Sequence, residues 1–420
     1  MYTTVHQEQE NALLIGIIKQ NEDRWIAEEH LNELELLADT AGANVLDKII
    51  QERHKVDPAT FIGRGKIDQI RDLVDQQDIS LIIFDEDLTP AQVRNLENFF
   101  EIKVIDRTVL ILDIFAKRAK TREAKTQVEL AQLKYLLPRL TRQWTHLSRQ
   151  VGGIGTKGPG ETQLEVDRRL IRLRIRALTH HLQKIQKRRS IHRSHRKNIF
   201  KVALVGYTNV GKSTLLNALT DSNVFVEDRL FATLDPTIKA LDFTDKNRVL
   251  LIDTVGFIRK LPHHLIASFR STLEEAAEAD LLLHLVDISH PHFENQMEIV
   301  REVLKELNMD TKTTIHVFNK VDLLNGATII SRLREQYPDS VFISALRGVF
   351  LEDLKKRILE FLEGKMIETD VILDVKNSKL ISKIYSLAEV LETNYTDSKV
   401  NLRIRAEQKH FDQIRYLIEK

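Results

Sequence analysis

The chain has 420 residues, 42% of them hydrophobic, and a formal net charge of +1. This length is too great for one hydrophobic core and predicts about three domains. No apolar run approaches the ~18 residues that a membrane span requires, and no charged and apolar leader precedes a cleavage site, so we expect neither a span nor a secretory signal. The chain contains no cysteine, which excludes disulfides and thiolate metal sites and is compatible with a cytoplasmic protein.

Residues 1–116 alternate apolar runs with stretches of helical spacing, which predicts a small α/β domain with a largely parallel sheet. The predicted strands cover residues 13–18, 43–50, 81–84 and 102–105, and the predicted helices cover residues 28–41, a stretch after residue 66 that ends near 77, and 89–100. The turn at Gly63 and Gly65 lacks the third glycine of a dinucleotide-binding loop and is interpreted as structural. Asp85, Glu86 and Asp87 follow a strand and are interpreted as an acidic loop in preference to a metal site.

Residues 117–197 differ from the rest of the chain in charge and in hydrophobic spacing. They hold 22 Lys and Arg against 5 Asp and Glu, a local charge of +17, which leaves −16 for the remainder. Such a basic segment is typical of proteins that bind a phosphate backbone, and a helical surface balanced by acidic domains is the alternative. Apolar residues recur three and four apart in both halves, which predicts an antiparallel helical hairpin with Pro138 kinking its first arm. The two seams are Leu130, Leu133, Leu137, Leu140, Trp144 and Leu147, and then Leu164, Ile171, Ile175, Leu178, Leu182 and Ile185.

A glycine-rich tip, residues 152–162, connects the two predicted arms. Five glycines and a proline within nine of these residues exclude a helix. The bare backbone and the basic residues around it favour close contact with folded RNA, which proteins recognise largely by shape and phosphate; a floppy turn is the alternative. Those basic residues are Arg149, Lys157, Arg168 and Arg169.

An apolar strand at 202–205 and a helix that opens at Leu215 flank the sequence G-Y-T-N-V-G-K-S. This sequence fits G-x-x-x-x-G-K-[ST], in which backbone N–H groups surround phosphate oxygens at a helix N-terminus. We expect Lys212 to reach the β and γ phosphates and Ser213 to ligate Mg²⁺. The predicted nucleotide-binding residues of this loop are Gly206, Tyr207, Thr208, Asn209, Val210, Gly211, Lys212 and Ser213.

Three later motifs each follow a predicted strand. After the strand at 249–252 comes D-T-V-G, where Asp253 can hold Mg²⁺ through water and the Gly256 N–H can sense a γ-phosphate. After 315–318 comes N-K-V-D, whose Asp322 carboxylate can accept from guanine N1–H and the 2-amino group, a pair that adenine does not offer. After 341–343 comes S-A-L, where a backbone N–H can bind guanine O6. The order of the motifs predicts a GTP-hydrolysing switch domain, with nucleotide contacts at Asp253, Thr254, Val255, Gly256, Asn319, Lys320, Val321, Asp322, Ser344, Ala345 and Leu346.

These motifs resemble the HflX family of translational GTPases. The match comprises G-Y-T-N-V-G-K-S-T-L from Gly206, F-A-T-L-D-P-T from Phe231, D-T-V-G-F-I from Asp253 and G-G-x-G-x-x-G-P-G-E-T-Q-L-E-x-D-R-R over 152–169, and it covers at least residues 60–350. The resemblance implies a GTPase that binds the large ribosomal subunit, reaches its rRNA with the hairpin tip, and splits stalled or idle ribosomes with GTP. It also favours Thr233 over Thr237 as the switch I ligand of Mg²⁺. The switch I residues expected to contact the nucleotide are Phe231, Ala232, Thr233, Leu234 and Asp235.

The predicted fold class is α/β, with a P-loop G domain at 198–364. A small α/β domain (1–116) and the basic helical hairpin (117–197) precede it. A second small α/β domain (365–420) follows, with strands at 371–374 and 400–404 and helices at 377–391 and from Gln408 onwards. No feature of the sequence calls for an oligomer, so we expect a monomer.

The residue after D-x-x-G bears on the mechanism, because many such GTPases place there a Gln that orients water. Phe257 occupies that position here, so we expect slow hydrolysis, with Lys212, Thr233 and Gly256 acting on the phosphates, and stimulation by the large ribosomal subunit. Asn209 resembles the P-loop residue of GTPases that hold K⁺, which makes K⁺ a candidate cofactor beside GTP and Mg²⁺. Two other functions stay open: an RNA remodeller with little preference for GTP, and a GTP-gated scaffold without ribosome contact.

Overall fold

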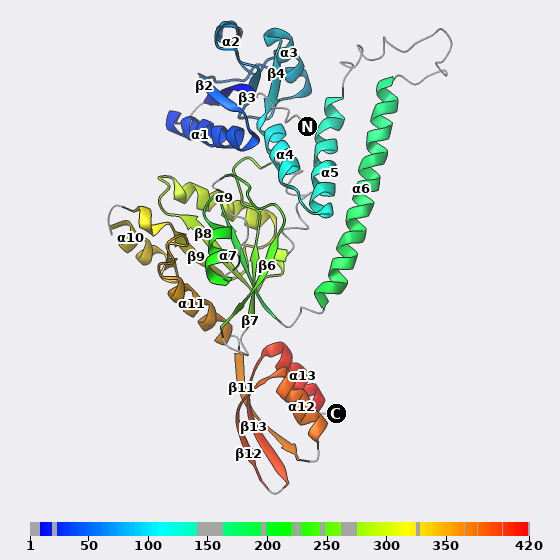
Figure 1. The fold of residues 1–420 in the computed structure, drawn as a ribbon, viewed down its shortest axis with the longest axis vertical. Coiled ribbons are helices and arrows are strands. Elements are labelled where there is room, and N and C mark those ends of the chain that lie inside the picture. The colour runs from blue at the N-terminus through cyan, green and yellow to red at the C-terminus, as the bar shows by residue number, and fades with distance from the viewer. Residues whose placement is uncertain are drawn as a thin grey trace, which may run out of the picture.

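The computed structural model describes residues 9–18, 23–140, 163–194, 199–220, 222, 227, 229–243, 248–261, 275–324, 328–364, 366–375, 377–396 and 398–418. Within these ranges the chain forms three β-sheets and a pair of long helices. A four-stranded sheet lies at one end of the elongated molecule, a six-stranded sheet in the middle and a three-stranded sheet at the other end (Figure 1). Among the helices in these ranges, none combines the length and the apolar character that crossing a bilayer demands.

The N-terminal sheet has the order β2-β1-β3-β4, and all its strands are parallel, as predicted. Alternating strand residues divide between two cores, with Leu14 and Ile83 facing α1 and α4, and Leu13 and Ile82 facing α2 and α3. A capping box at Thr89 opens α3. The strands are β1 (Asn11–Ile18), β2 (Asn44–Glu52), β3 (Leu81–Phe84) and β4 (Lys103–Asp106), and the helices are α1 (Arg24–Ala41), α2 (Arg64–Gln77), α3 (Pro90–Phe100) and α4 (Arg107–Arg118).

Helix α4 was not predicted, and the expected domain boundary at residue 116 falls inside it. Asp106 begins the helix because its side chain accepts a hydrogen bond from Val109 N. One face of α4 packs on the sheet and the end of the helix reaches towards the six-stranded sheet (Figure 1). This helix therefore links the N-terminal sheet to the helical pair that follows.

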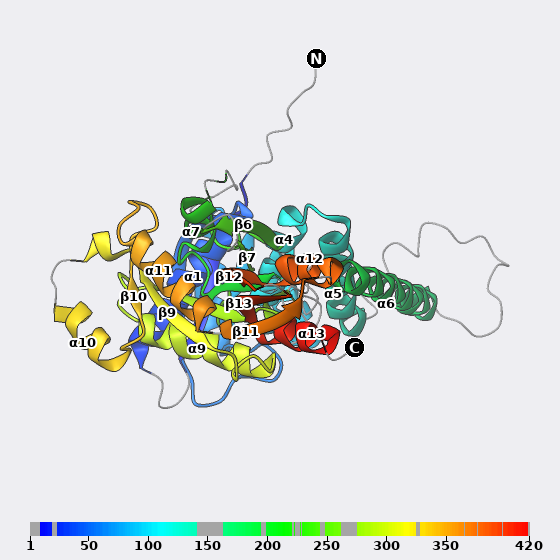
Figure 2. The same ribbon diagram turned by 90° about the horizontal axis from the view of Figure 1, so that it is seen from below.

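Helices α5 (Arg122–Arg139) and α6 (Gln163–Ser194) lie side by side along the flank of the molecule (Figures 1 and 2). Leu130 and Leu178, one from each predicted seam, are buried, and Arg174 of α6 pairs with Glu129 of α5 at 2.7 Å. Pro138 was predicted to kink the first arm, but it lies one residue before the end of α5 and so marks the end of this helix. Trp144, Leu147, Arg149 and the tip with Lys157 lie outside the described residues.

The central sheet has the order β10-β9-β8-β5-β7-β6, with β6 antiparallel and the other strands parallel. Because parallel strands end at the same edge, Gly206, Asp253 and Asn319 come together there. Edge strand β6 was not predicted, since its first residue belongs to the switch I motif. The strands are β5 (Phe200–Gly206), β6 (Thr237–Asp242), β7 (Arg248–Asp253), β8 (Leu281–Asp287), β9 (Thr314–Asn319) and β10 (Val341–Phe342). The helices are α7 (Lys212–Thr220), α9 (Phe293–Glu306), α10 (Thr328–Gln336), α11 (Leu351–Glu363) and the 3₁₀ turn η2 (Val321–Leu323).

The C-terminal sheet has the antiparallel order β11-β13-β12, with α12 and α13 on one face. Residues 389–391 were predicted to end a helix, but they open β12, whose Val390 pairs with Ile404 of β13. Pairing with β13 thus outweighed the helical spacing seen in the sequence. The elements are β11 (Met366–Asp374), α12 (Ser378–Leu387), β12 (Glu389–Tyr395), β13 (Lys399–Glu407) and α13 (Gln408–Ile418).

Candidate guanine nucleotide site

The predicted phosphate loop joins β5 to α7, which is the context its motif requires. Gly211 has φ +93°, and a Cβ there would lie 2.5 Å from Asn319 Nδ2, so only glycine fits. Asn209 also has a left-handed backbone, with φ 61°. These turns curl the loop over the first turn of α7, where backbone N–H groups and the helix dipole favour phosphate.

Lys212 is buried beneath this loop, and its ammonium group donates to the carbonyl of Tyr207 at 2.6 Å and to that of Gly206 at 3.3 Å. Burial lowers the pKa of Lys212 to about 8, although the nearby Asp253 carboxylate acts in the opposite direction. A charged ammonium held this way can turn from the loop carbonyls to phosphate oxygens without crossing the cavity. The position therefore suits the phosphate contact predicted for Lys212.

Three oxygen-bearing side chains converge beside the phosphate loop. Ser213 Oγ lies 2.7 Å from Thr233 Oγ1 and 2.6 Å from Asp253 Oδ2. Asp253 is fully buried, burial raises its pKa, and among the described residues its Oδ1 has no hydrogen-bond partner. Hydroxyl and carboxylate oxygens with one such unpaired oxygen fit Mg²⁺. Thr237 pairs with Asp253 across β6 and β7, so Thr233 is the switch I hydroxyl at this position.

The cavity over the loop brings most of the predicted phosphate residues together. The predicted residues that line it are Thr208, Asn209, Gly211, Lys212, Ser213, Phe231, Ala232, Thr233, Thr254 and Gly256. Sequence reasoning missed three further lining residues, Thr214, Glu227 and Arg229. Thr214 continues the loop motif, and a charged pair just before switch I is the signal that points to the other two. Val210, Leu234 and Val255 are buried in the surrounding core.

Switch I contacts two helices outside the central sheet, α4 and α5. Phe231 packs edge-on against Phe115 of α4, with ring centroids 4.7 Å apart. Asp235 accepts from the backbone N–H of Lys120 and of Thr121 at 3.2 Å each, and from Thr121 Oγ1 at 2.5 Å. Thr121 is the N-cap of α5. The Asp235 carboxylate is therefore engaged with the start of α5, and the nucleotide contact of Asp235 stays a prediction.

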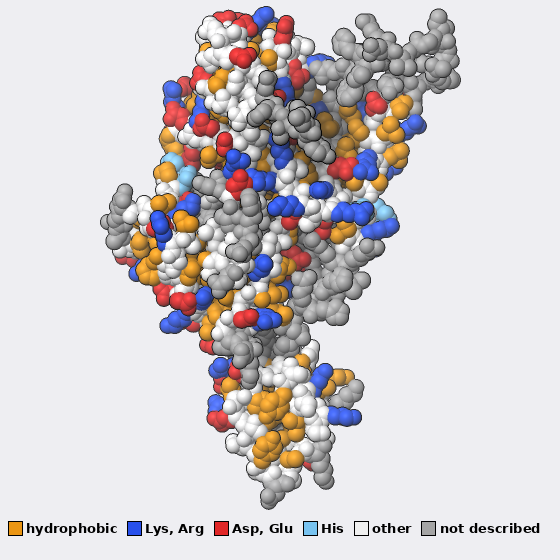
Figure 3. Space-filling model, in the orientation of Figure 1, with side chains coloured by type: hydrophobic (Ala, Val, Ile, Leu, Met, Phe, Trp, Pro, Cys, Tyr) orange, Lys and Arg blue, Asp and Glu red, His pale blue; other side chains and the backbone are white. Residues whose placement is uncertain are grey.

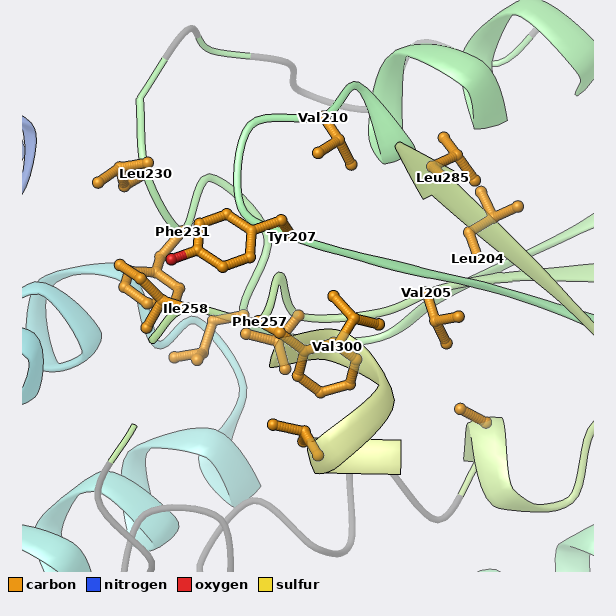
Figure 4. Packing of buried hydrophobic residues seen from close by; sticks show 14 of the residues in the cluster. Leu204, Val205, Tyr207, Val210, Leu230, Phe231, Phe257, Ile258, Leu285 and Val300 are labelled. Atoms are coloured by element: carbon orange, nitrogen blue, oxygen red, sulfur yellow. The ribbon is translucent and has the colours of Figure 1, made fainter. Parts of the chain in front are cut away.

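The D-x-x-G segment is bonded directly to the phosphate loop. Thr208 N donates to Phe257 O at 2.7 Å, and Phe257 N donates to Gly206 O at 3.0 Å. A Cβ on Gly256 would lie 2.7 Å from Thr208 Cα, so glycine is needed for this close approach. The Phe257 ring is buried in the core near Ile258 (Figure 4). Phe257 thus cannot orient water at the phosphates.

A buried cluster of charges joins the residues after D-x-x-G to the N-terminal sheet. Asp85, 4% exposed, contacts Arg107 at 3.0 Å, Arg259 at 3.1 Å and Lys260 at 2.6 Å. Glu33 of α1 contacts Arg107 and Arg259 at 2.6 Å each. Burial by itself raises the pKa of Asp85, but the three cations outweigh it and lower that pKa to about 2. Asp85 is thus not part of the solvated acidic loop predicted for residues 85–87.

Tyr207 extends this cluster into the phosphate loop. Its hydroxyl donates to Glu33 and accepts from Arg259 N, the latter at 3.0 Å. The side chain is buried among Leu230, Phe231 and Ile258 (Figure 4). Among the predicted nucleotide-binding residues, Tyr207 therefore has its backbone in the phosphate loop, whereas its side chain contacts the N-terminal part of the chain.

The predicted base-binding motifs lie at the ends of β9 and β10. Asn319 braces the site, since Nδ2 donates to Val210 O at 2.8 Å and Oδ1 accepts from Ala345 N at 2.9 Å. Lys320 pairs with Asp287 at 2.6 Å. Asp322, in η2 beside Val321, is exposed and accessible to a base.

In the S-A-L loop, two of the three backbone N–H groups that could donate to guanine O6 already have partners. Ser344 N donates to Val349 O at 3.2 Å, and Ala345 N donates to Asn319 Oδ1. The amide of Leu346, whose side chain is 76% exposed, is then the candidate donor. Ser344 and Ala345 shape this loop.

Comparison with known proteins agrees with this geometry. Family models match residues 28–116 (GTP-binding GTPase N-terminal), 118–196 (GTP-binding GTPase middle region) and 201–320 (50S ribosome-binding GTPase). The GTPase HflX of Lacrimispora saccharolytica is 45% identical over 394 residues, which cover 93% of this chain and 92% of the relative. That of Escherichia coli K12 is 44% identical over 401 residues, 94% of this chain and 93% of the relative.

A crystal structure of a GTP-binding protein from the archaeon Sulfolobus solfataricus in complex with GDP aligns with a TM-score of 0.45 and 26% identity, over 84% of this chain and 98% of that chain. The relatives of 44% and 45% identity are matched over nearly their whole length, which confirms the resemblance seen in the motifs. The chain therefore belongs to the HflX family and is a GTP-binding enzyme that hydrolyses GTP.

Proposed function

We propose that this GTPase binds the large ribosomal subunit and its rRNA through the basic segment 117–197 and, in its GTP state, splits stalled or idle ribosomes. The observation that carries the proposal is the bond between switch I and the basic helices, in which the Asp235 carboxylate accepts hydrogen bonds from Lys120 and Thr121 immediately before α5. In GTPases the γ-phosphate orders switch I, and hydrolysis releases it. The nucleotide can therefore bias the position of the basic helices.

The charge of that segment favours RNA as the partner. It carries +17, and the family model over residues 201–320 is described as a 50S ribosome-binding GTPase. In the space-filling view, basic side chains and exposed hydrophobic ones share the flank formed by α6 (Figure 3). The exposed arginines of α6 include Arg169, Arg172 and Arg176. Contacts of this kind neutralise phosphates, so we expect binding to weaken steeply with salt.

In the proposed cycle the phosphate loop and Lys212 hold the β and γ phosphates, and the Gly256 N–H senses the γ-phosphate. Ser213 and Thr233, beside Asp253, would hold Mg²⁺, which neutralises charge on the phosphates when bound. Because the Phe257 ring lies in the core, the D-x-x-G segment lacks a water-orienting side chain, and we expect the large subunit to raise the rate at least about tenfold. A flat response would contradict this.

Specificity for guanine would come from Asp322, and K⁺ is a second candidate cation. Asn209 lines the phosphate cavity, which supports a role for this residue in holding K⁺ there. Equal hydrolysis rates in K⁺ and Na⁺ would rule out that role. The proposal includes a cytoplasmic protein that acts as a monomer.

Sedimentation with ribosomes tests the proposal in three states: GTP analogue, GDP and no nucleotide. We expect co-sedimentation with the large subunit, and loss of intact ribosomes, with the GTP analogue alone. Asp235→Ala should reduce the difference in binding between the nucleotide states. Asp242→Ala, which removes an exposed carboxylate paired with Arg248, is the matched control and should behave as the unmodified protein.

The same experiment separates the alternatives. Binding that responds equally to ATP and GTP would favour the RNA remodeller, and no binding in any state would favour the GTP-gated scaffold. Nucleotide-independent binding by the unmodified protein would remove the role of switch I.

A further inference from the structure

The residues around the phosphate cavity contain a cation that the nucleotide motifs do not include. Of the described residues that line this cavity, only Lys212 and Arg229 carry positive side chains. Lys212 belongs to the phosphate loop, whereas Arg229 precedes switch I and its side chain is 47% exposed. Arg229 therefore lines the cavity as part of a different segment from the loop's own lysine, one that changes with nucleotide in GTPases.

The backbone next to Arg229 is firmly anchored. Leu230 and Phe231 are 5% and 3% exposed, and Leu234 is 3% exposed, so the residues after Arg229 are fixed in the core. Between these anchors, Thr233 lies 2.7 Å from Ser213. A cation set at the edge of such an anchored segment is held near the phosphates without being buried itself.

A neighbouring carboxylate holds the Arg229 side chain in an ion pair. Glu227 lies 3.4 Å from Arg229, and its other oxygen lies 2.6 Å from Arg118 at the end of α4. Glu227 also lines the phosphate cavity. The two arginines thus share one carboxylate through its two oxygens, and the longer distance belongs to Arg229. Arg229 is the cation that a new negative charge in the cavity can more easily draw away.

Hydrolysis creates such a charge. A water oxygen bonds to the γ-phosphorus while the bond from that phosphorus to the β,γ-bridging oxygen breaks, and the electron pair of the broken bond stays with GDP. A proton of the water passes to a γ-phosphate oxygen, which gives inorganic phosphate. In the transition state negative charge is spread over the transferring group and the bridging oxygen, and an arginine placed there accelerates the reaction. Its planar fork of donors suits these oxygens better than a single ammonium.

We propose that Arg229 is a catalytic arginine supplied by the chain itself, which leaves its ion pair with Glu227 to contact the transferring phosphate in the transition state. The proposal rests on GTP hydrolysis by this chain and not on any ribosome contact. It also gives α4 a part in catalysis, because Arg118 neutralises part of the Glu227 charge and so weakens the attraction of Glu227 for Arg229.

Single-turnover hydrolysis by the full chain without ribosomes tests this role. We expect Arg229→Ala to lower the rate at least about tenfold while the Kd values for GTP and GDP change by less than about threefold. It should also abolish the complex of GDP with aluminium fluoride, a mimic of the transferring phosphate. Arg229→Lys should recover only part of the rate. Arg248→Ala, which removes an arginine from an exposed ion pair at the far end of β7, is the matched control and should keep the full rate.

Three outcomes would overturn the proposal: an unchanged rate in Arg229→Ala, a rate loss matched by an equal loss of GTP affinity, or the same loss in Arg248→Ala. The shared carboxylate adds a test with opposite signs. Glu227→Gln should raise the single-turnover rate, and Arg118→Ala should lower it, because Glu227 then binds Arg229 alone. Changes in the same direction would contradict this role of Glu227. The side chains of Arg118, Glu227 and Arg229 are 20%, 27% and 47% exposed, so the fold should tolerate these changes.

Discussion

Replacing Asp85 with Asn should release the residues after D-x-x-G from the N-terminal sheet. The carboxylate is 4% exposed and contacts Arg107, Arg259 and Lys260 within 3.1 Å. Its pKa falls from 3.8 to about 2, which corresponds to about 2 kcal/mol of stability at neutral pH. Removing one partner of a buried ion pair costs about 3–5 kcal/mol, because the remaining charge stays buried. We therefore expect Asp85→Asn to lower the free energy of unfolding by about 2–5 kcal/mol.

Urea unfolding combined with hydrogen exchange measures this effect and locates it. Protection should fall at residues 258–260, while the C-terminal sheet keeps its protection. Asp242→Asn, in an exposed pair with Arg248, should leave the unfolding transition unchanged. Because the native pKa of Asp85 is depressed, its contribution is complete above pH 3.8 and disappears as the pH falls towards 2. Equal transitions for both variants would refute the assignment of the buried cluster as the link between these parts.

Three further predictions concern the nucleotide site. Phosphate should raise the pKa of Lys212 from about 8, so GTP affinity, measured with a fluorescent analogue, should fall by up to about tenfold per pH unit above 8, and a flat profile would contradict this. Asp322→Asn should lose GTP binding and gain xanthosine triphosphate binding; retained GTP preference would remove Asp322 from base recognition. Phe257→Gln should not accelerate hydrolysis, since the side chain at this position is 1% exposed. It should lower the free energy of unfolding by about 3–5 kcal/mol. A faster rate in single-turnover assays would show that the side chain can reach the phosphates.

The parts of the site that sequence predicts well are those set by local structure. The phosphate loop, D-x-x-G and N-K-x-D each follow a buried strand, and parallel strands bring their ends to one edge. Ser213, Thr233 and Asp253 therefore meet, as predicted. Each motif carries its own turn residues, so its geometry depends little on the rest of the chain.

The contacts that sequence missed join distant segments. Asp85 and Arg259 are 174 residues apart, and Asp235 and Thr121 are 114 apart, and neither pair lies within a shared motif. A charged residue in a loop is usually solvated, which made Asp85 look like part of an acidic surface. Arg107 comes from the N-terminal part itself, and only packing of that part against the central sheet adds Arg259 and Lys260.

Both switch segments contact parts of the molecule outside the central sheet, so nucleotide binding and the position of those parts are thermodynamically coupled. Switch I is hydrogen-bonded to the N-cap of α5 through Asp235. The residues after D-x-x-G are bound to the N-terminal part of the chain through the ion pair between Arg259 and Asp85. A nucleotide that favours one arrangement of these segments must favour the matching position of the helices, and a partner that holds those helices must change nucleotide affinity by the same factor. Asp235→Ala removes one of the two connections and leaves the other. The factor by which the partner still changes the nucleotide affinity of this variant therefore measures the coupling that passes through the buried cluster at Asp85.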